Sequence, residues 1–171
     1  MLVLLWDASA LVKRYAPELG SDVVSTLFEA VPPAQMVVTV LGCAETHAII
    51  VRKKNGGVIK PSTYSAAASL LQNEVIYGPD FGVLPLEFDA ILSGIDLITR
   101  HNINSADASI LMTYLQFAAD ARVSDTSCLL VATDRRLLRA AQAEGLETIN
   151  PESVSEVGLA DYLARLTAWH P

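Results

Sequence analysis

LVLLWD, at residues 2–7, is a short continuous apolar run that ends in an acid. A run of this kind is typical of a strand buried on both faces, as in a parallel sheet. Similar short apolar stretches follow at residues 36–40, 84–88, 129–132 and 146–149, and we expect each to be a strand.

Helices are expected between these strands, because capping residues, Gly and Pro punctuate the intervening segments. The expected helices are residues 8–16, 20–30, 42–54, 62–76, 89–101, 105–121, 135–144 and 158–168, with Ser21, Ser62 and Ser105 as N-caps. Strands that alternate with helices predict an α/β layered fold with a mainly parallel sheet. No repeat or linker is visible, so residues 1–171 are expected to form a single domain.

Composition excludes several classes of protein. Hydrophobic residues make up 51% of the 171 residues and charged residues 18%, which excludes a disordered chain. No apolar run is long enough to cross a bilayer, and the N-terminal stretch lacks the features of a signal peptide, so a cytoplasmic location is expected. Cys43 and Cys128 lie far apart in apolar segments, and we expect buried, reduced thiols.

The net charge of −7 argues against a nucleic-acid partner, because phosphate binding requires Lys and Arg. That objection weakens if four of the 19 acids are metal ligands, since 15 acids then face 12 bases. The bases also cluster, at residues 52–54 and at Arg135, Arg136 and Arg139. A charge cluster is usually only a solvated face, so this is a weak indication of phosphate contacts.

Four acids stand where a structural role alone does not explain them. Asp7 and Asp134 each end an apolar strand, and the carboxyl ends of parallel strands line the ligand crevice of such a sheet. The alternative for both is an N-cap of the following helix. Glu45 and Asp107 fall on apolar helix faces, where a carboxylate should be paired, protonated or bound to a cation. The alternatives are a stripe-edge side chain that bends to water for Glu45 and a first-turn acid that favours the helix dipole for Asp107.

Strand ends and inner helix faces can converge in a sandwich of helices on a sheet. Carboxylates that cluster repel one another, and a divalent cation removes the repulsion. Ligation by oxygen alone favours Mg²⁺ or Mn²⁺ over zinc. The residues by themselves therefore predict an acidic metal site on an α/β domain.

Five stretches of the chain, in order, resemble the motifs of the PIN-domain family. They are LLWDASALVKRY at residues 4–15, TVLGCAETHAIIVR at 39–52, SADASILMTYL at 105–115, LVATDRRLL at 130–138 and INPE at 149–152. The resemblance covers roughly residues 1–152, although residues 72–88 match no motif.

The resemblance implies a three-layer fold, with a parallel five-stranded sheet flanked by helices. It also implies a Mg²⁺- or Mn²⁺-dependent endoribonuclease that hydrolyses RNA phosphodiester bonds with Asp7, Glu45, Asp107 and Asp134 as metal ligands and catalytic residues. Many bacterial relatives are VapC-type toxins that pair with an antitoxin and form homodimers. The family also contains RNA-processing nucleases outside toxin systems, and the sequence does not separate these two roles.

In the mechanism that we expect, a metal-activated water attacks phosphorus and the 3′ oxygen leaves, so no protein nucleophile is needed. Ser9 and Thr133 are candidates to orient the ligands, with local capping as the alternative. Lys13, Arg14 and Arg135 are weak candidates for RNA phosphate contacts. The three histidines have no metal-ligand spacing, so a catalytic histidine is not expected.

Other classes fit less well. A dehalogenase-type phosphatase requires a second Asp two residues after the first, and Ser9 stands there. A response-regulator receiver requires a late Lys after a strand, where this chain has Asp134, and no GxxxxGK loop occurs. The main alternative is a PIN-like module that binds RNA or a protein without cutting.

Overall fold

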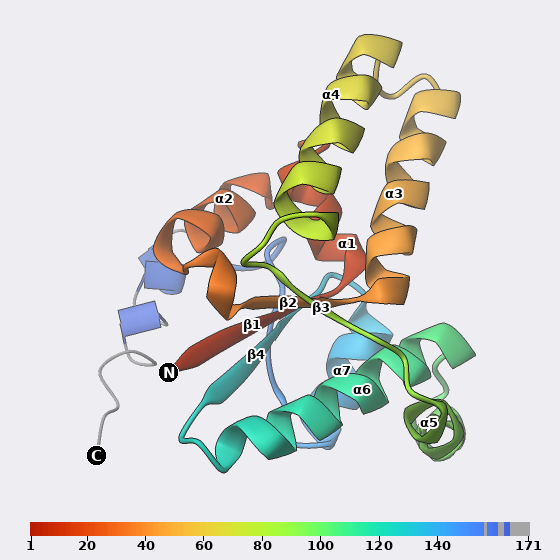
Figure 1. Ribbon diagram of the computed structural model, residues 1–171, viewed down its shortest axis with the longest axis vertical. Helices are drawn as coiled ribbons and strands as arrows, with labels where there is room; N and C mark the ends of the chain where they lie inside the picture. Colours follow the sequence, from red (N-terminus) through yellow and green to blue (C-terminus); the bar gives the residue numbers. More distant parts are fainter. Residues whose placement is uncertain (156, 161–162, 165–171) are drawn as a thin grey trace.

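A five-stranded sheet forms the centre of the computed structural model, which describes residues 1–155, 157–160 and 163–164 (Figure 1). The strand order is β3-β2-β1-β4-β5, and every neighbouring pair is parallel. The strands are β1 Leu2–Trp6, β2 Met36–Thr39, β3 Gly82–Leu84, β4 Ser127–Val131 and β5 Glu147–Ile149. The parallel sheet expected from the sequence is confirmed.

Helices cover both faces of the sheet and make the fold three-layered. They are α1 Ala8–Leu11, α2 Ser21–Ala30, α3 Val40–Asn55, α4 Pro61–Leu71, α5 Phe88–His101, α6 Ser105–Arg122 and α7 Arg135–Ala143, with the short turns η1 Val12–Arg14, η2 Pro33–Gln35 and η3 Gln72–Ile76. No helix among the described residues is long and apolar enough to cross a bilayer.

The side chains of β1 alternate between two hydrophobic cores. Leu4 and Trp6 pack in the first core, with residues of α1 to α4. Val3 and Leu5 pack in the second, with residues of α5 to α7. Because successive side chains of a strand point to opposite faces, a strand covered on both sides must be apolar throughout. This explains why LVLLW contains no polar residue.

Three of the expected N-cap residues are wrong, each for a local reason. Lys60 is the N-cap of α4 in place of Ser62, because Pro61 occupies the first helical position, where its missing N–H costs nothing. Asn104 caps α6 in place of Ser105, and its side chain accepts from the backbone of the third residue of the helix. Gly20 precedes α2 in place of a Ser21 cap; its φ is +83°, and a Cβ there would lie 2.7 Å from a backbone oxygen.

Two other boundaries differ from those expected. The third strand is at residues 82–84, and not at 84–88, because Pro85 has no N–H to donate to a neighbouring strand. The helix expected over 8–16 becomes α1 followed by a 3₁₀ turn. Of the closing helix expected over 158–168, residues 157–160 and 163–164 are helical, and the rest lies outside the described residues.

Cys43 and Cys128 are free and buried, as expected. Burial raises the pKa of each thiol to about 11, so both are neutral at physiological pH.

Candidate metal centre

Asp7 follows β1 directly and is almost fully buried. It is the N-cap of α1, and its Oδ2 accepts hydrogen bonds from the backbone N–H of Ser9, at 2.9 Å, and from the Ser9 hydroxyl. Burial raises the pKa of Asp7 above its usual range; the Ser9 hydrogen bonds oppose that shift, and the charge of Asp134 adds to it.

Ser9 links Asp7 to the end of the neighbouring strand β4. Its hydroxyl oxygen accepts from the backbone N–H of Thr133 at 3.0 Å. Asp134 then caps α7, with Oδ1 2.7 Å from the backbone nitrogen of Arg136. The capping interpretation is therefore correct for both Asp7 and Asp134, since one carboxylate oxygen of each accepts from the backbone at the start of the following helix.

Glu45 lies half-buried on α3 and makes no hydrogen bond within the described residues. Burial raises its pKa, and the negative charges of Asp7 and Asp107 raise it further, while Arg52 lowers it. Burial at a site without charged neighbours would produce only the first of these increases in pKa. The second increase, caused by the charges of Asp7 and Asp107, requires that the three acids lie close together in space.

Asp107 lies in the first turn of α6 and is half-buried. Its Oδ2 accepts from Asn104 Nδ2 at 2.8 Å. Burial raises the pKa of Asp107 to about 6, with further contributions from the charges of Asp7 and Asp134, against the lowering effect of Arg136. The acids predicted from four separate segments thus interact with one another, at the carboxyl edge of the sheet.

The four carboxylates fit a hard divalent cation in donor type and charge. Oxygen donors are those that Mg²⁺ and Mn²⁺ prefer, and a cation would remove the repulsion that raises the pKa values. As the side chains stand, no three His, Cys, Asp or Glu residues of the described chain are gathered tightly enough to enclose an ion. Hydrogen bonds hold one oxygen each of Asp7, Asp107 and Asp134, so binding of an ion requires the carboxylates, including that of Glu45, to move closer together.

Tyr114 holds the strand ends that carry the site, a role that the sequence analysis missed. Its hydroxyl donates to the carbonyl oxygen of Trp6 at 2.7 Å and accepts from the backbone N–H of Thr39 at 3.2 Å. The side chain is fully buried on α6. A tyrosine in an apolar stripe must find a partner for its hydroxyl, and that was the available signal.

The solved structures that the chain resembles share this architecture. The structure of FitAB bound to an IR36 DNA fragment matches with a TM-score of 0.64 and 14% identity, over 90% of this chain and 99% of that one. The chain has a PIN-like fold.

Two other solved structures have the same fold. PAE2754 from Pyrobaculum aerophilum matches with a TM-score of 0.58 and 20% identity, over 98% of this chain and 96% of that one. A toxin–antitoxin complex from Klebsiella pneumoniae contains a chain that matches with a TM-score of 0.53 and 14% identity, over 88% and 99% of the two chains. No protein-family profile matches the sequence, and no curated protein does.

Two of the basic residues first considered for RNA have structural partners in this PIN-like fold. Lys13 is buried, with Nζ 3.0 Å from Glu18 and 2.8 Å from Glu152. Arg14 pairs with Glu74 at 3.0 Å. Both side chains are therefore committed to ion pairs within the chain, whereas Arg135 is exposed at the start of α7.

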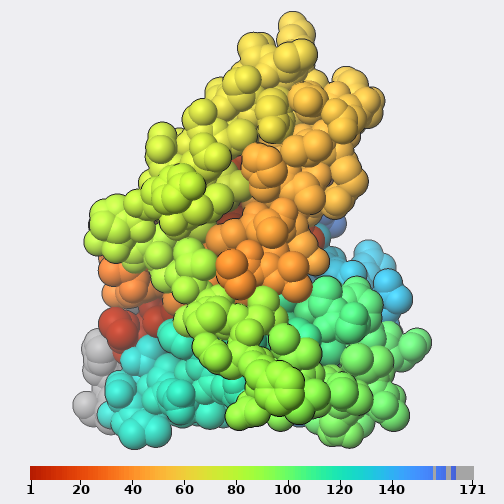
Figure 2. Space-filling view, turned by 45° about the vertical axis from the view of Figure 1, so that its right-hand side comes forward, coloured from red at the N-terminus to blue at the C-terminus, as the bar shows by residue number. Residues whose placement is uncertain are grey.

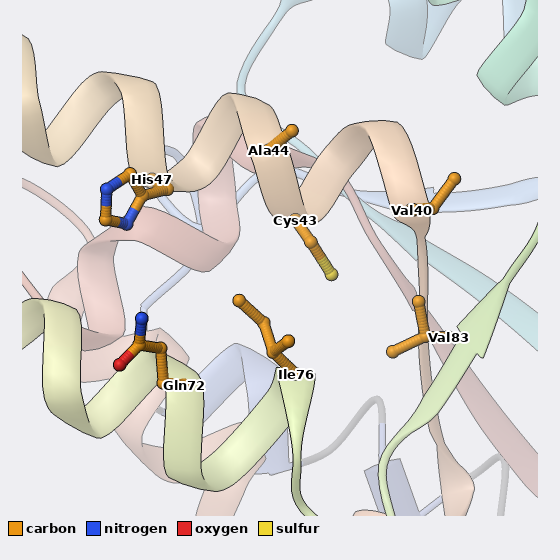
Figure 3. Close-up of a pocket in the computed structure, with 7 residues that line it drawn as sticks. All are labelled: Val40, Cys43, Ala44, His47, Gln72, Ile76 and Val83. Carbon is orange, nitrogen blue, oxygen red and sulfur yellow. The ribbon is translucent and has the colours of Figure 1, made fainter.

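An apolar hollow of about 440 Å³ lies between α3, η3 and β3 (Figure 3), on the face where the orange α3 borders the yellow-green segments in Figure 2. Its lining residues come from α3, η3 and β3 and are Val40, Cys43, Ala44, His47, Gln72, Ile76 and Val83. Cys43 and Ile76 point toward each other across it in Figure 3. A second hollow of about 350 Å³ shares Val40 and Ala44 and extends to α5 and α6. None of the four acids lines either hollow, and this face offers mainly apolar contact area.

Proposed function

We propose that the chain is a metal-dependent endoribonuclease in which Asp7, Glu45, Asp107 and Asp134 hold Mg²⁺ or Mn²⁺. The observation that carries the proposal is the mutual electrostatic effect of carboxylates from two strand ends and two helices. Without a cation, the repulsion between these carboxylates would destabilise the folded protein and nothing in the site would offset it.

The chain's own residues would orient the reaction. Ser9, fixed by the Thr133 backbone, would hold Asp7 in one rotamer, and Asn104 would do the same for Asp107. The bound ion would lower the pKa of a water molecule and offset negative charge on the phosphate. Water would attack phosphorus, and the 3′ oxygen would leave.

We further propose that the protein is the toxin of a toxin–antitoxin pair, with an antitoxin as partner, and that it forms homodimers. A solved toxin–antitoxin complex with a chain of the same fold supports the first part. The apolar hollows beside α3 supply contact area for a protein partner. A single domain and a cytoplasmic location stay predictions from the sequence.

The alternative is a PIN-like module that binds RNA or protein without cutting. The observation in its favour is that the acids do not enclose an ion as they stand.

The experiment is cleavage of a mixed set of labelled RNAs by the purified protein with Mg²⁺, with Mn²⁺ and with EDTA. Asp7→Asn should abolish cutting and leave the fold intact, while Asp120→Asn, at the exposed far end of α6, should cut like the wild type. Metal-dependent cutting that Asp7→Asn retains would refute the assignment of the site. Neither cutting nor metal binding by calorimetry would favour the non-catalytic module.

A further inference from the structure

Most basic residues of the described chain are already engaged by a partner. Carboxylates pair with Lys13, Arg14, Lys53 and Arg100, a tyrosine ring lies under Lys54, and backbone carbonyls accept from Arg122 and Arg139. Four have side chains with neither a hydrogen bond nor an ion pair among the described residues: Arg52, Lys60, Arg135 and Arg136. All four are exposed. Two of these four lie close to the acids.

Arg52 lies on the same side of α3 as Glu45. Seven residues separate them, which is two helical turns with an angular offset of about 20° and a rise of about 10 Å. The positive charge of Arg52 reaches Glu45 and lowers its pKa, yet the two side chains form no ion pair. The guanidinium group is therefore beside the acid cluster and free to bind another anion.

Arg136 lies on the other side of the cluster. It is in the first turn of α7, and its backbone N–H holds Asp134. Its positive charge acts on Asp107 and lowers that pKa. Arg135, a weak candidate from the sequence, is exposed at the first position of the same helix.

The two arginines belong to opposite layers of the fold. α3 packs in the first hydrophobic core through Ile50, and α7 packs in the second through Leu137. Figure 1 shows α3 rising on one side of the strand ends and α7 lying on the other. The carboxyl ends of β1 and β4, which lead into Asp7 and Asp134, meet side by side between these two helices.

We propose that Arg52 and Arg136 bind the RNA phosphates on the two sides of the cleaved one, so that a single strand crosses the acid cluster from α3 to α7. This inference rests on the proposed function. A guanidinium group binds phosphate in a bidentate manner, and an RNA strand that approaches four carboxylates in a protein of charge −7 needs local positive charge on its path. Contacts on both sides favour a cut within a strand over trimming of an end.

The test is binding of a short fluorescein-labelled single-stranded RNA, by anisotropy, in the Asp7→Asn background with Mg²⁺ present. Each lost phosphate contact lowers the slope of log K against log salt by about 0.7, which is about fivefold in affinity at 0.1 M salt and about twofold at 0.4 M. Arg52→Gln and Arg136→Gln should each show this loss. The matched control is Arg122→Gln, which removes the same charge about 22 Å along α6 from Asp107. It should keep the salt slope.

Sidedness is tested with RNAs that carry one uncharged methylphosphonate linkage on either side of the mapped cut. A linkage on one side of the cut should weaken binding by the Asp7→Asn protein but should not weaken binding further when Arg52→Gln is added. A linkage on the other side should have no effect only when Arg136→Gln is added. If both variants are insensitive to the same linkage, the strand does not cross the cluster.

Failure of this inference is distinct from failure of the proposed function. RNA binding and metal-dependent cutting by the wild type, with Arg52→Gln and Arg136→Gln behaving like the control, overturn only the arginine assignment. No RNA binding by any form overturns both.

Discussion

Replacing Asp107 with Asn should stabilise the metal-free protein, although it removes a proposed ligand. Asp107 has a pKa of about 6 in the folded state, against 3.8 for an ordinary aspartate. An acid with a raised pKa stabilises the fold below its unfolded pKa, near 4, and that contribution is lost as the pH rises through 6. At pH 7.5 the wild-type protein therefore bears the full cost of the charge, and the Asn variant does not.

The magnitude follows from the shift and from two effects that reduce it. About two pKa units correspond to at most about 3 kcal/mol. Asp107 is only half-buried, and solvent screening roughly halves that figure. A carboxylate in the first turn of a helix also gains roughly 0.5 kcal/mol from the helix dipole, which Asn gives up. Asn keeps an oxygen for the Asn104 amide, so the expected net gain is about 1 kcal/mol.

Thermal unfolding followed by circular dichroism in EDTA measures this gain. For a protein of this length it corresponds to a rise in Tm of about 2–4 °C at pH 7.5, and the rise should shrink toward pH 4, where wild-type Asp107 is protonated. Asp120→Asn, on the exposed part of the same helix, should change Tm by less than about 1 °C. Excess Mg²⁺ should then raise the Tm of the wild type more than that of the variant. A variant that is less stable at pH 7.5, or a gain that does not depend on pH, would refute the electrostatic reasoning.

Three further predictions concern the groups that support the site. Tyr114→Phe leaves an N–H and a carbonyl group at two strand ends without their buried partner, so we expect a loss of about 1–3 kcal/mol in urea unfolding; an unchanged midpoint would mean that the hydroxyl does not hold the strands. Ser9→Ala should lower kcat about 10- to 100-fold, because Asp7 is no longer oriented, while Ser9→Thr should restore part of the rate. If Ser9→Ala also lost its cooperative unfolding transition, the role would be structural. Lys13→Met leaves Glu152 without its ion pair, while Glu18 keeps Lys53, and should cost about 1–3 kcal/mol in stability without changing the salt slope of RNA binding; a change in that slope would return Lys13 to the RNA contacts.

Much of the fold is visible in single segments of the chain. LVLLW is apolar at every position because both faces of β1 are covered, and this property of one segment predicts a parallel sheet between two helical layers. The β3 strand was misplaced because Gly82–Leu84 is partly exposed at the sheet edge and carries little apolar signal. The N-cap predictions for Ser62 and Ser105 are wrong because of a neighbouring residue. Pro61 occupies the first position of α4, and the Asn104 side chain caps α6.

The sequence by itself determined which carboxylates are anomalous, since a strand-end acid and an acid on an apolar helix face are local features. Their convergence is decided by the tertiary structure alone, because α3 and α6 reach the strand ends through packing between residues far apart in the chain. The same holds for charge. Lys13 and Arg14 were weak candidates for RNA contact from the sequence, and the folded chain brings Glu152 and Glu74 to neutralise them. Arg52 and Arg136 stay unpaired beside the acids, since ion pairing depends on distances across the fold that no local pattern encodes.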